Sequence, residues 1–149
     1  MEVYMKIANL VVEGKNIRKI SNILYNHQDD FYRGKPYMYS DGDIIVLMRE
    51  RYYKRISSYI MSVIFMKFID DNMVEIEIAC SGGREGILML DYGAQKSEDV
   101  DIVNQIIDVC SVYSWEITKI EPQDLLVSFK EGITDKIKEE ISNHFKKNN

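Results

Sequence analysis

The sequence predicts an α+β fold in which one antiparallel β-sheet carries helices on a single face. Three observations favour this class. Apolar strand patterns follow one another between residues 43 and 91 with only short turns, whereas parallel strands would need crossovers of about a dozen residues. Helical patterns precede and follow that stretch. Of the 149 residues, 46% are hydrophobic and only 8 are Gly and 2 Pro, a composition typical of a soluble globular protein.

The N-terminal part predicts a strand followed by a helix. Residues Met1–Val12 read as a strand that ends at Gly14. Asn16 is a suitable N-cap, and an apolar stripe with helical spacing then runs to about His27. We expect His27 to be partly buried at the C-terminal end of this helix, where it can bond the last carbonyl groups.

The segment Gln28–Gly42 is polar, aromatic and rich in turn residues. Pro36 leaves room for only a short strand, at Tyr37–Ser40. The aromatic side chains of this segment could form the lid of a pocket or simply cover an edge of the sheet. We favour the covering role.

Three strands are predicted in the centre of the chain, and a fourth after a glycine-rich turn. Asp43–Tyr53 emerges into water at its basic end. Tyr59–Ile69 is apolar at nearly every position, which predicts a central strand covered on both faces. Met73–Cys80 alternates cleanly and has one wet face, and the apolar run Gly86–Leu90 predicts the last of these strands.

The C-terminal third predicts a long helix, a hairpin and a last helix. The long helix spans Lys96–Tyr113, with Ser97 as its N-cap. Trp115–Ile120 and Leu125–Phe129 read as the two strands of the hairpin, and apolar residues at helical spacing mark the last helix over residues 134 to about 146.

These elements follow the order β-α-β4/5-α-β-β-α. We expect a single domain over residues 1–149, with residues 114–149 a possible C-terminal β-β-α extension. A single sheet with helices on one face satisfies this order, as in helix-grip and TATA-binding-protein-like architectures, where a curved sheet wraps a long helix. A ferredoxin-like arrangement is the alternative.

Composition and termini narrow the class of protein. No apolar run reaches the roughly 18 to 20 residues that cross a bilayer, and the N-terminus lacks the pattern of a secretion signal. Cys80 and Cys110 occupy inward positions, so buried reduced thiols are favoured over a disulfide, and a two-cysteine metal site is disfavoured. These features predict a cytoplasmic location without a membrane partner.

The formal charge of −5 is unevenly divided. Residues 1–67 contain 11 Lys and Arg against 7 Asp and Glu, whereas residues 68–149 contain 8 against 17. The division could reflect a basic face with an anionic partner. Halves of a sequence need not correspond to faces of a fold, however, and we favour this simpler interpretation.

The first candidate site is the basic, tyrosine-bearing run Arg49–Arg55, RERYYKR. Basic and aromatic side chains together can bind phosphates and stack on bases, and alternation places Arg49 and Arg51 on the same face. A solvated strand end is the simpler interpretation, and a site for an anion or an acidic partner is the alternative. Nucleic acid is disfavoured because Glu50 interrupts the run and the domain is acidic.

The second candidate is the glycine-rich run Ser81-Gly82-Gly83-Arg84-Glu85-Gly86. Its glycines allow backbone N–H groups to turn toward an anion, and Arg84 could clamp that anion. The run is not a Walker A loop, because no Lys followed by Ser or Thr stands after the second glycine. A turn or bulge between strands is the simpler interpretation.

The strand end RERYYKR, two further strands, Ser81-Gly82-Gly83 and a short apolar strand before a long helix form an order that resembles a family of small uncharacterised bacterial α+β proteins with a domain of unknown function. The resemblance covers roughly Ile7–Tyr113. It implies a bacterial or archaeal cytosolic protein and offers no activity or catalytic residues to carry over.

No motif indicates a particular reaction. The two histidines lie on separate predicted helices, so no histidine cluster can bind a metal, and no Ser or Cys lies in a nucleophile motif. We expect no catalytic residues, no metal and no cofactor. The leading hypothesis is a non-enzymatic domain that binds a small molecule in a cleft between the sheet and the Lys96–Tyr113 helix, or acts in protein interactions, with a homodimer as a possible assembly.

The alternative hypothesis is an enzyme that acts on a small anionic substrate. Its binding residues would be Arg49, Arg51 and Arg84. Its acid or base would be Tyr52, His27 or Glu75, and the binding arginines would have to converge on one concave surface.

Overall fold

The computed structural model describes residues 7–27, 29–54, 57–82 and 88–121, and within the last range the side chains of residues 101–121. The strands are β1 (Ile7–Glu13), β2 (Tyr37–Asp41), β3 (Ile44–Tyr53), β4 (Ser58–Asp70), β5 (Met73–Gly82) and β6 (Glu116–Glu121). The helical elements are a short 3₁₀ turn, η1 (Ile17–Lys19), and the helices α1 (Ile20–Asn26) and α2 (Leu88–Tyr113).

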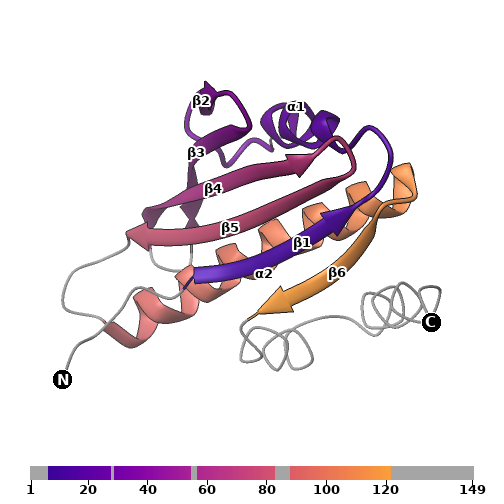
Figure 1. Ribbon diagram of the computed structural model, residues 1–149. Helices are drawn as coiled ribbons and strands as arrows, with labels where there is room; N and C mark the ends of the chain where they lie inside the picture. Colours follow the sequence, from indigo (N-terminus) through magenta and orange to yellow (C-terminus); the bar gives the residue numbers. More distant parts are fainter. Residues whose placement is uncertain (1–6, 28, 55–56, 83–87, 122–149) are drawn as a thin grey trace, which may run out of the picture.

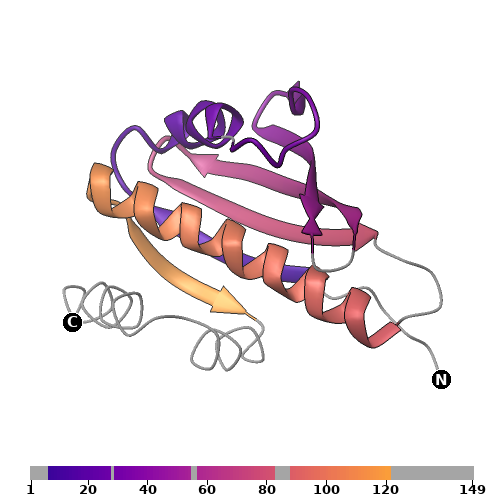
Figure 2. The same ribbon diagram turned by 180° about the vertical axis from the view of Figure 1, so that it is seen from behind.

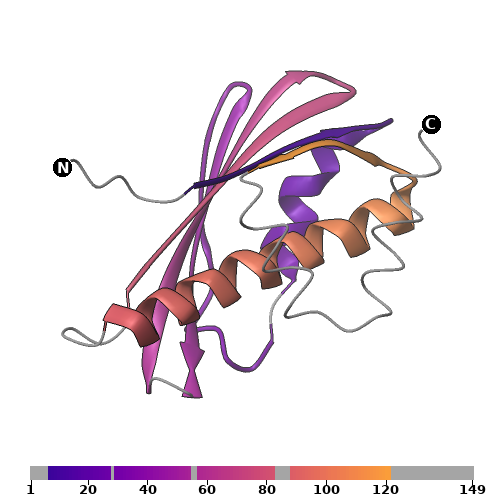
Figure 3. The same cartoon turned by 90° about the horizontal axis from the view of Figure 1, so that it is seen from below.

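The six strands form one sheet in the order β2-β3-β4-β5-β1-β6, and every neighbouring pair is antiparallel (Figure 1). Seen from behind, α2 lies in front of the sheet (Figure 2). Seen from below, α1 and α2 lie on the same side of the sheet (Figure 3). This arrangement confirms the predicted α+β class with helices on one face. We call that side the inner face and the opposite side the outer face.

The core lies between the inner face and the helices. Alternate strand residues point inward, and they form one apolar cluster with the 3₁₀ turn, α1 and α2. Ile102, Val103, Ile106 and Cys110 of α2 are fully buried against the sheet. Over its described side chains, α2 is therefore packed directly on the sheet, and the predicted cleft between sheet and helix is wrong for this part of the helix.

Strand β4 is central, as predicted, but only its inner face is covered. Ile60, Ile64 and Met66 are fully buried, whereas Met61 and Phe65 on the outer face are 37% and 46% exposed. A run that is apolar at nearly every position is typical of a strand buried on both sides, but here apolar residues of the outer face stay exposed.

The predicted strand at Gly86–Leu90 is wrong, because Leu88–Leu90 already belong to α2. Short apolar runs fit a buried helix as well as a strand, so periodicity cannot separate the two. Gly93 lies inside α2, where a glycine costs about 1 kcal/mol relative to alanine. The helix begins eight residues before the predicted start at Lys96, and Ser97 is not its N-cap.

The first helix lies where the sequence predicts it, but its ends differ. Asn16 has left-handed backbone angles (φ 59°), and its side chain forms no cap hydrogen bond. His27 follows the last helical residue with an extended backbone and is exposed, so the predicted partial burial of this side chain is wrong.

Strand β6 confirms the predicted strand at Trp115–Ile120, and it pairs with β1 at one edge of the sheet. Three predictions lie wholly or partly outside the described residues: the hairpin partner Leu125–Phe129, the last helix, and residues 1–6 of the predicted first strand, Met1–Val12. Cys80 and Cys110 are buried, and neither forms a disulfide within the described residues, which confirms the prediction of buried thiols. Burial raises the pKa of the Cys110 thiol to about 12. Among the described helices, none is long and apolar enough to cross a membrane.

Candidate anion-binding site

The loop before β2 follows the free edge of β3 and then leaves it. The Tyr52 N–H donates to the Phe31 carbonyl (2.9 Å), and the Arg33 N–H donates to the Glu50 carbonyl (2.8 Å). At Gly34 (φ 66°) the chain turns away, and it returns to β3 only where Tyr37 pairs with Met48.

A cavity of about 490 Å³ lies at this detour. It is large enough for a small ligand, since ligand pockets measure roughly 300 to 1,000 Å³. The segment Tyr32–Tyr37 lines it together with Met48, Arg49 and Glu50 of β3 and Met61 of β4. The aromatic loop therefore covers the sheet edge, as expected, and also encloses a pocket.

Arg49 is the buried cation of this region. It lies on the inner face and is only 3% exposed, and its Nη1 donates to Gln105 Oε1 of α2 (3.1 Å). The ring of Tyr32 lies under the guanidinium, 4.9 Å from Cζ to the ring centre. The Nε and Nη2 atoms have no hydrogen-bond partner among the described residues. Ser62 of β4 stands opposite Arg49 of β3 in the sheet and is also fully buried. Its hydroxyl has no hydrogen-bond partner among the described residues.

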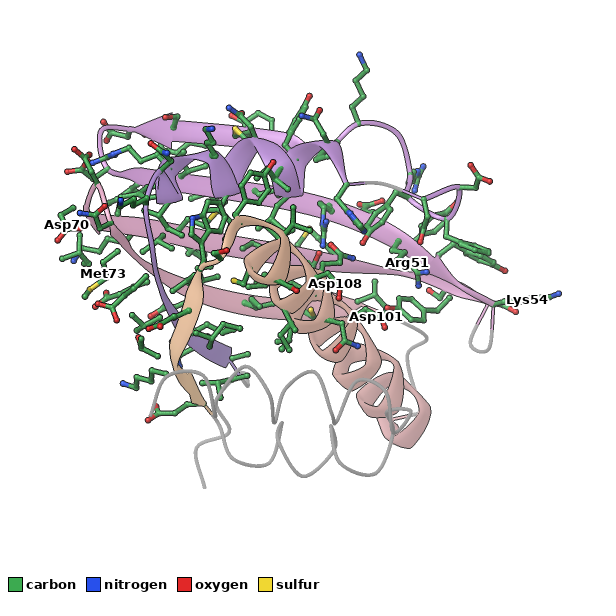
Figure 4. The ribbon with its side chains drawn as sticks, turned by 90° about the vertical axis from the view of Figure 1, so that its right-hand side faces the viewer. Arg51, Lys54, Asp70, Met73, Asp101 and Asp108 are labelled. Carbon is green, nitrogen blue, oxygen red and sulfur yellow. The ribbon has the colours of Figure 1, made fainter. Side chains whose placement is uncertain are left out.

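Arg51 lies two residues further along β3, and each of its three guanidinium nitrogens has an acidic partner. Its Nε and Nη2 donate to Asp29 Oδ2 (3.2 and 2.9 Å), and its Nη1 lies 3.8 Å from Asp101 Oδ2 of α2. Figure 4 shows Arg51 and Asp101 beside one another, at the opposite end of the sheet from Asp70 and Met73. Although partial burial opposes it, bonding to Asp29 raises the pKa of Arg51. Arg51 thus ties the loop to α2.

The pKa values of the two carboxyl groups that contact Arg51, those of Asp29 and Asp101, are shifted in opposite directions. Partial burial alone would raise the pKa of Asp29, but hydrogen bonds from Arg51 and the Phe31 N–H outweigh it and hold this pKa below its ordinary value. Burial raises the pKa of Asp101, because the charge of Arg51 and the hydroxyl of Tyr53, which donates at 3.2 Å, offset the desolvation only in part.

These opposite shifts predict opposite pH dependences of stability. The contribution of Asp29 is present above the ordinary carboxyl pKa, about 3.9, and is lost as pH falls through its lower folded value. The contribution of Asp101 is present below that ordinary pKa and is lost as pH rises through its higher folded value. In urea unfolding from pH 3 to 7, Asp29→Asn should therefore lose most stability relative to wild type at pH 7. Asp101→Asn should gain relative to wild type as pH rises, and equal slopes for the two variants would contradict the assignment.

The glycine-rich candidate is only partly described, because Gly83 and Arg84 lie outside the described residues. Ser81 is exposed on the outer face, and Gly82 shares a row of the sheet with Arg51, with Ile60 between them. Two strand spacings separate Gly82 from Arg51, about 10 Å. The fold therefore brings Arg49 and Arg51 together around Tyr32, but it leaves Ser81 and Gly82 apart from them.

The predicted acid and base residues do not gather at the arginines. Tyr52 lies on the outer face beside Tyr59, with the two rings tilted by 59° and their centres 5.3 Å apart. Glu75 lies on the same outer face and is exposed. The sheet separates both from the inner-facing Arg49 and Arg51. His27 is exposed at the end of α1.

The described part of the run RERYYKR, residues 49–54, does not form a free basic surface, and Arg55 lies outside the described residues. Arg49 is buried, Arg51 is paired, and Glu50 lies 3.6 Å from Arg33. Lys54 is exposed at the far end of the strand, away from this cluster (Figure 4). This distribution favours neither an acidic partner nor nucleic acid at this run.

Sequence reasoning missed Tyr32, Lys35 and Gln105 as members of the site. Tyr32 was visible only as part of the aromatic load of the loop. Gln105 stands one helical turn after Asp101, and this polar pair beside the apolar stripe of α2 was the available signal. Its meaning depends on which strand faces the helix. No cluster of three or more His, Cys, Asp or Glu within the described residues could hold a metal ion.

Comparisons with protein-family models, with curated proteins and with solved structures give no match to this chain. The resemblance inferred from the two motifs therefore stays a prediction, and its short apolar strand before the long helix is part of α2 instead.

Proposed function

We propose that this chain is a non-enzymatic binding domain for a small anionic molecule, held between the loop 32–37 and β3 with Arg49 as its anchor. The observation that carries the proposal is the state of Arg49, a cation 3% exposed with two guanidinium nitrogens that have no hydrogen-bond partner in the described part of the chain.

A buried charge without partners is costly. An unpaired buried donor costs about 1 to 3 kcal/mol, and a charged group costs more. The single neutral bond to Gln105 and the ring of Tyr32 offset only part of this penalty. An anion within reach of Nε and Nη2 would supply charge-assisted bonds in the fork geometry that guanidinium favours.

The Arg49 guanidinium lies on the inner face under the ring of Tyr32, whereas Met48, Glu50 and Met61 border the cavity from the outer face, so in this proposal the ligand reaches Arg49 around the β3 edge at Tyr32. Its ring covers the guanidinium, its backbone and ring belong to the loop that lines the cavity, and its hydroxyl accepts from Gln105 Nε2 at 3.3 Å. A rotation of this ring would open Arg49 to a ligand in the cavity.

The cavity lining indicates the chemistry of the ligand. Arg33 and Lys35 add positive charge, although Glu50 neutralises part of it. Pro36, Met48 and Met61 supply apolar surface. This combination favours a small molecule with one anionic group and an apolar or planar body. The ligand would lie beside the β2–β3 edge, and not in the sheet–helix cleft expected from the sequence.

The topology also supports a finer description of the fold. The elements β1-α1-β4-β5-α2-β6, with the sheet order β6-β1-β5-β4, follow the connectivity of a ferredoxin-like arrangement, and the β2–β3 hairpin extends its edge. This arrangement, the alternative expected from the sequence, is favoured over a helix-grip fold. It carries no function by itself.

The decisive variant is Arg49→Met, which keeps the length of the side chain and removes its charge. Without added anion it should be at least as stable as wild type, and up to about 2 kcal/mol more stable, because replacement of a buried charge by an apolar group removes the desolvation penalty. Thermal unfolding with inorganic phosphate or sulfate, against chloride at equal ionic strength, should show stabilisation of wild type and none of the variant.

Arg33→Met is the matched control, because Arg33 lines the same cavity but its side chain is 66% exposed. It makes the same charge change and should keep most of the anion response. Native mass spectrometry of protein from its own host should show an anionic adduct on wild type that Arg49→Met lacks. An Arg49→Met protein that retains the adduct, or a clearly less stable Arg49→Met without ligand, would refute Arg49 as the anchor.

A further inference from the structure

The outer face of β2, β3 and β4 exposes an apolar and aromatic surface, and no helix of the described chain covers it (Figure 3). Its exposed apolar side chains include Tyr37 (62%), Tyr39 (47%), Phe65 (46%) and Ile44 (43%). Apolar patches of this kind on a sheet face are typical of interaction sites. We call this surface the outer patch and define it as the outward residues of these three strands.

The registers arrange the outer patch in rows centred on β3. One row contains Tyr39, Val46 and Phe65, in the order β2, β3, β4. The next contains Tyr37, Met48 and Val63. In the first row an aromatic side chain stands on each side of Val46, so this row is nearly symmetric about β3. In the second row Met48 stands between Tyr37 and the smaller Val63.

A third row, next to the row of Val46, has one charged residue on each side of β3, and the two charges are opposite in sign. It contains Asp41 on β2, Ile44 on β3 and Lys67 on β4. Both charged residues are exposed, and neither forms an ion pair with another residue of the described chain. A two-fold axis along β3 would place Asp41 of one copy over Lys67 of the other, and Lys67 over Asp41.

We propose that the outer patch is the interface of a homodimer in which two sheets pack face to face about a two-fold axis along β3. The partner is a second copy of this chain, because a two-fold interface requires the same patch on both sides, and the row Asp41–Ile44–Lys67 is complementary in charge to itself. The apolar rows would fill the layer of about 10 Å between the sheets, with Val46 and Met48 facing their own copies.

The neighbouring strand limits the interface. On β5 the outward residues beside the patch include Glu75 and Glu77, which are exposed and acidic. Like charges on both copies would oppose an axis shifted toward β5. The outer patch shares Tyr37, Met48 and Met61 with the lining of the cavity, whereas the residues that the tests replace, Asp41, Phe65 and Lys67, do not line it.

A charge exchange tests this dimer. Asp41→Lys alone and Lys67→Asp alone each bring like charges together twice per dimer, so each should raise the dimer dissociation constant by at least about tenfold. The double variant Asp41→Lys/Lys67→Asp reverses both charges and should restore the wild-type constant. Sedimentation velocity over a range of protein concentrations measures it.

Two further variants keep this test decisive. Phe65→Asp should make the protein monomeric, and Lys19→Glu, a charge reversal at an exposed residue of the 3₁₀ turn, should leave the dimer unchanged. Circular dichroism verifies that each variant is folded. A monomeric wild type, or a double variant no stronger as a dimer than the single ones, would overturn the proposal.

Discussion

Replacement of Trp115 by alanine should lower the free energy of unfolding by about 4 kcal/mol, since loss of a buried tryptophan typically costs 3 to 5. Trp115 is 1% exposed at the junction of α2 and β6. Its Nε1 donates to the Lys15 carbonyl at 2.6 Å, and its ring stacks on Tyr113 with centres 4.9 Å apart. The ring fills the space beside Gly14. The Trp115 side chain, just before β6, therefore packs against the residues that directly follow β1.

Two further variants, Gly14→Ala and Trp115→Phe, test the packing of the Trp115 ring against Gly14. A β-carbon on Gly14 would lie 2.9 Å from Trp115 Cγ, so Gly14→Ala must displace a buried ring and should also destabilise. Trp115→Phe keeps most of the packing, loses the bond to Lys15, and should cost less than Trp115→Ala. Urea unfolding followed by circular dichroism measures all three, because Trp115 is the single tryptophan and its fluorescence is lost on replacement. A loss below about 1 kcal/mol in Trp115→Ala would mean that this junction does not anchor the sheet.

Much of the sheet could be predicted because local alternation and short turns determine it. Five of the six strands have short connections or clear period-two patterns, and strand pairing between neighbours such as β4 and β5 follows from the turn at Asp70–Asn72. The position of β1 between β5 and β6 depends on contacts between distant parts of the chain, and no local pattern indicates it.

The errors have a common physical origin, which is that a pattern shows burial but not its cause. The apolar run at Leu88–Leu90 fits either a strand or a helix start. The outer side of β4 looks like a second core because Met61 and Phe65 are apolar, yet both are exposed. In each case, the deciding information is which other element covers the residue.

The candidate site was predictable in part. Alternation places Arg49 and Arg51 on one face, but it cannot tell which face is covered by α2, and so a buried cation looked like a solvated strand end. Their different states depend on partners far along the chain, Asp29 and Asp101 for one arginine and Gln105 for the other.

Gly82→Ala should destabilise the protein by about 3 kcal/mol, for a structural reason and not because an anion binds at this glycine. Gly82 has φ +123°, a conformation that costs a residue with a side chain about 1 to 3 kcal/mol. A β-carbon there would also lie 2.8 Å from the Tyr59 carbonyl oxygen, a backbone atom that cannot move without disturbing the pairing of β4 with β5. Urea unfolding should show this loss together with an unchanged response to phosphate.

Ser81→Ala is the matched control for this position. Ser81 is the exposed neighbour on the outer face, so its replacement should change stability by less than about 0.5 kcal/mol. The pair of variants separates the two interpretations of the glycine-rich run. A Gly82→Ala protein that keeps its stability but loses the phosphate response would place the anion at the end of β5, whereas the expected loss of stability with phosphate binding intact leaves Arg49 as the anchor.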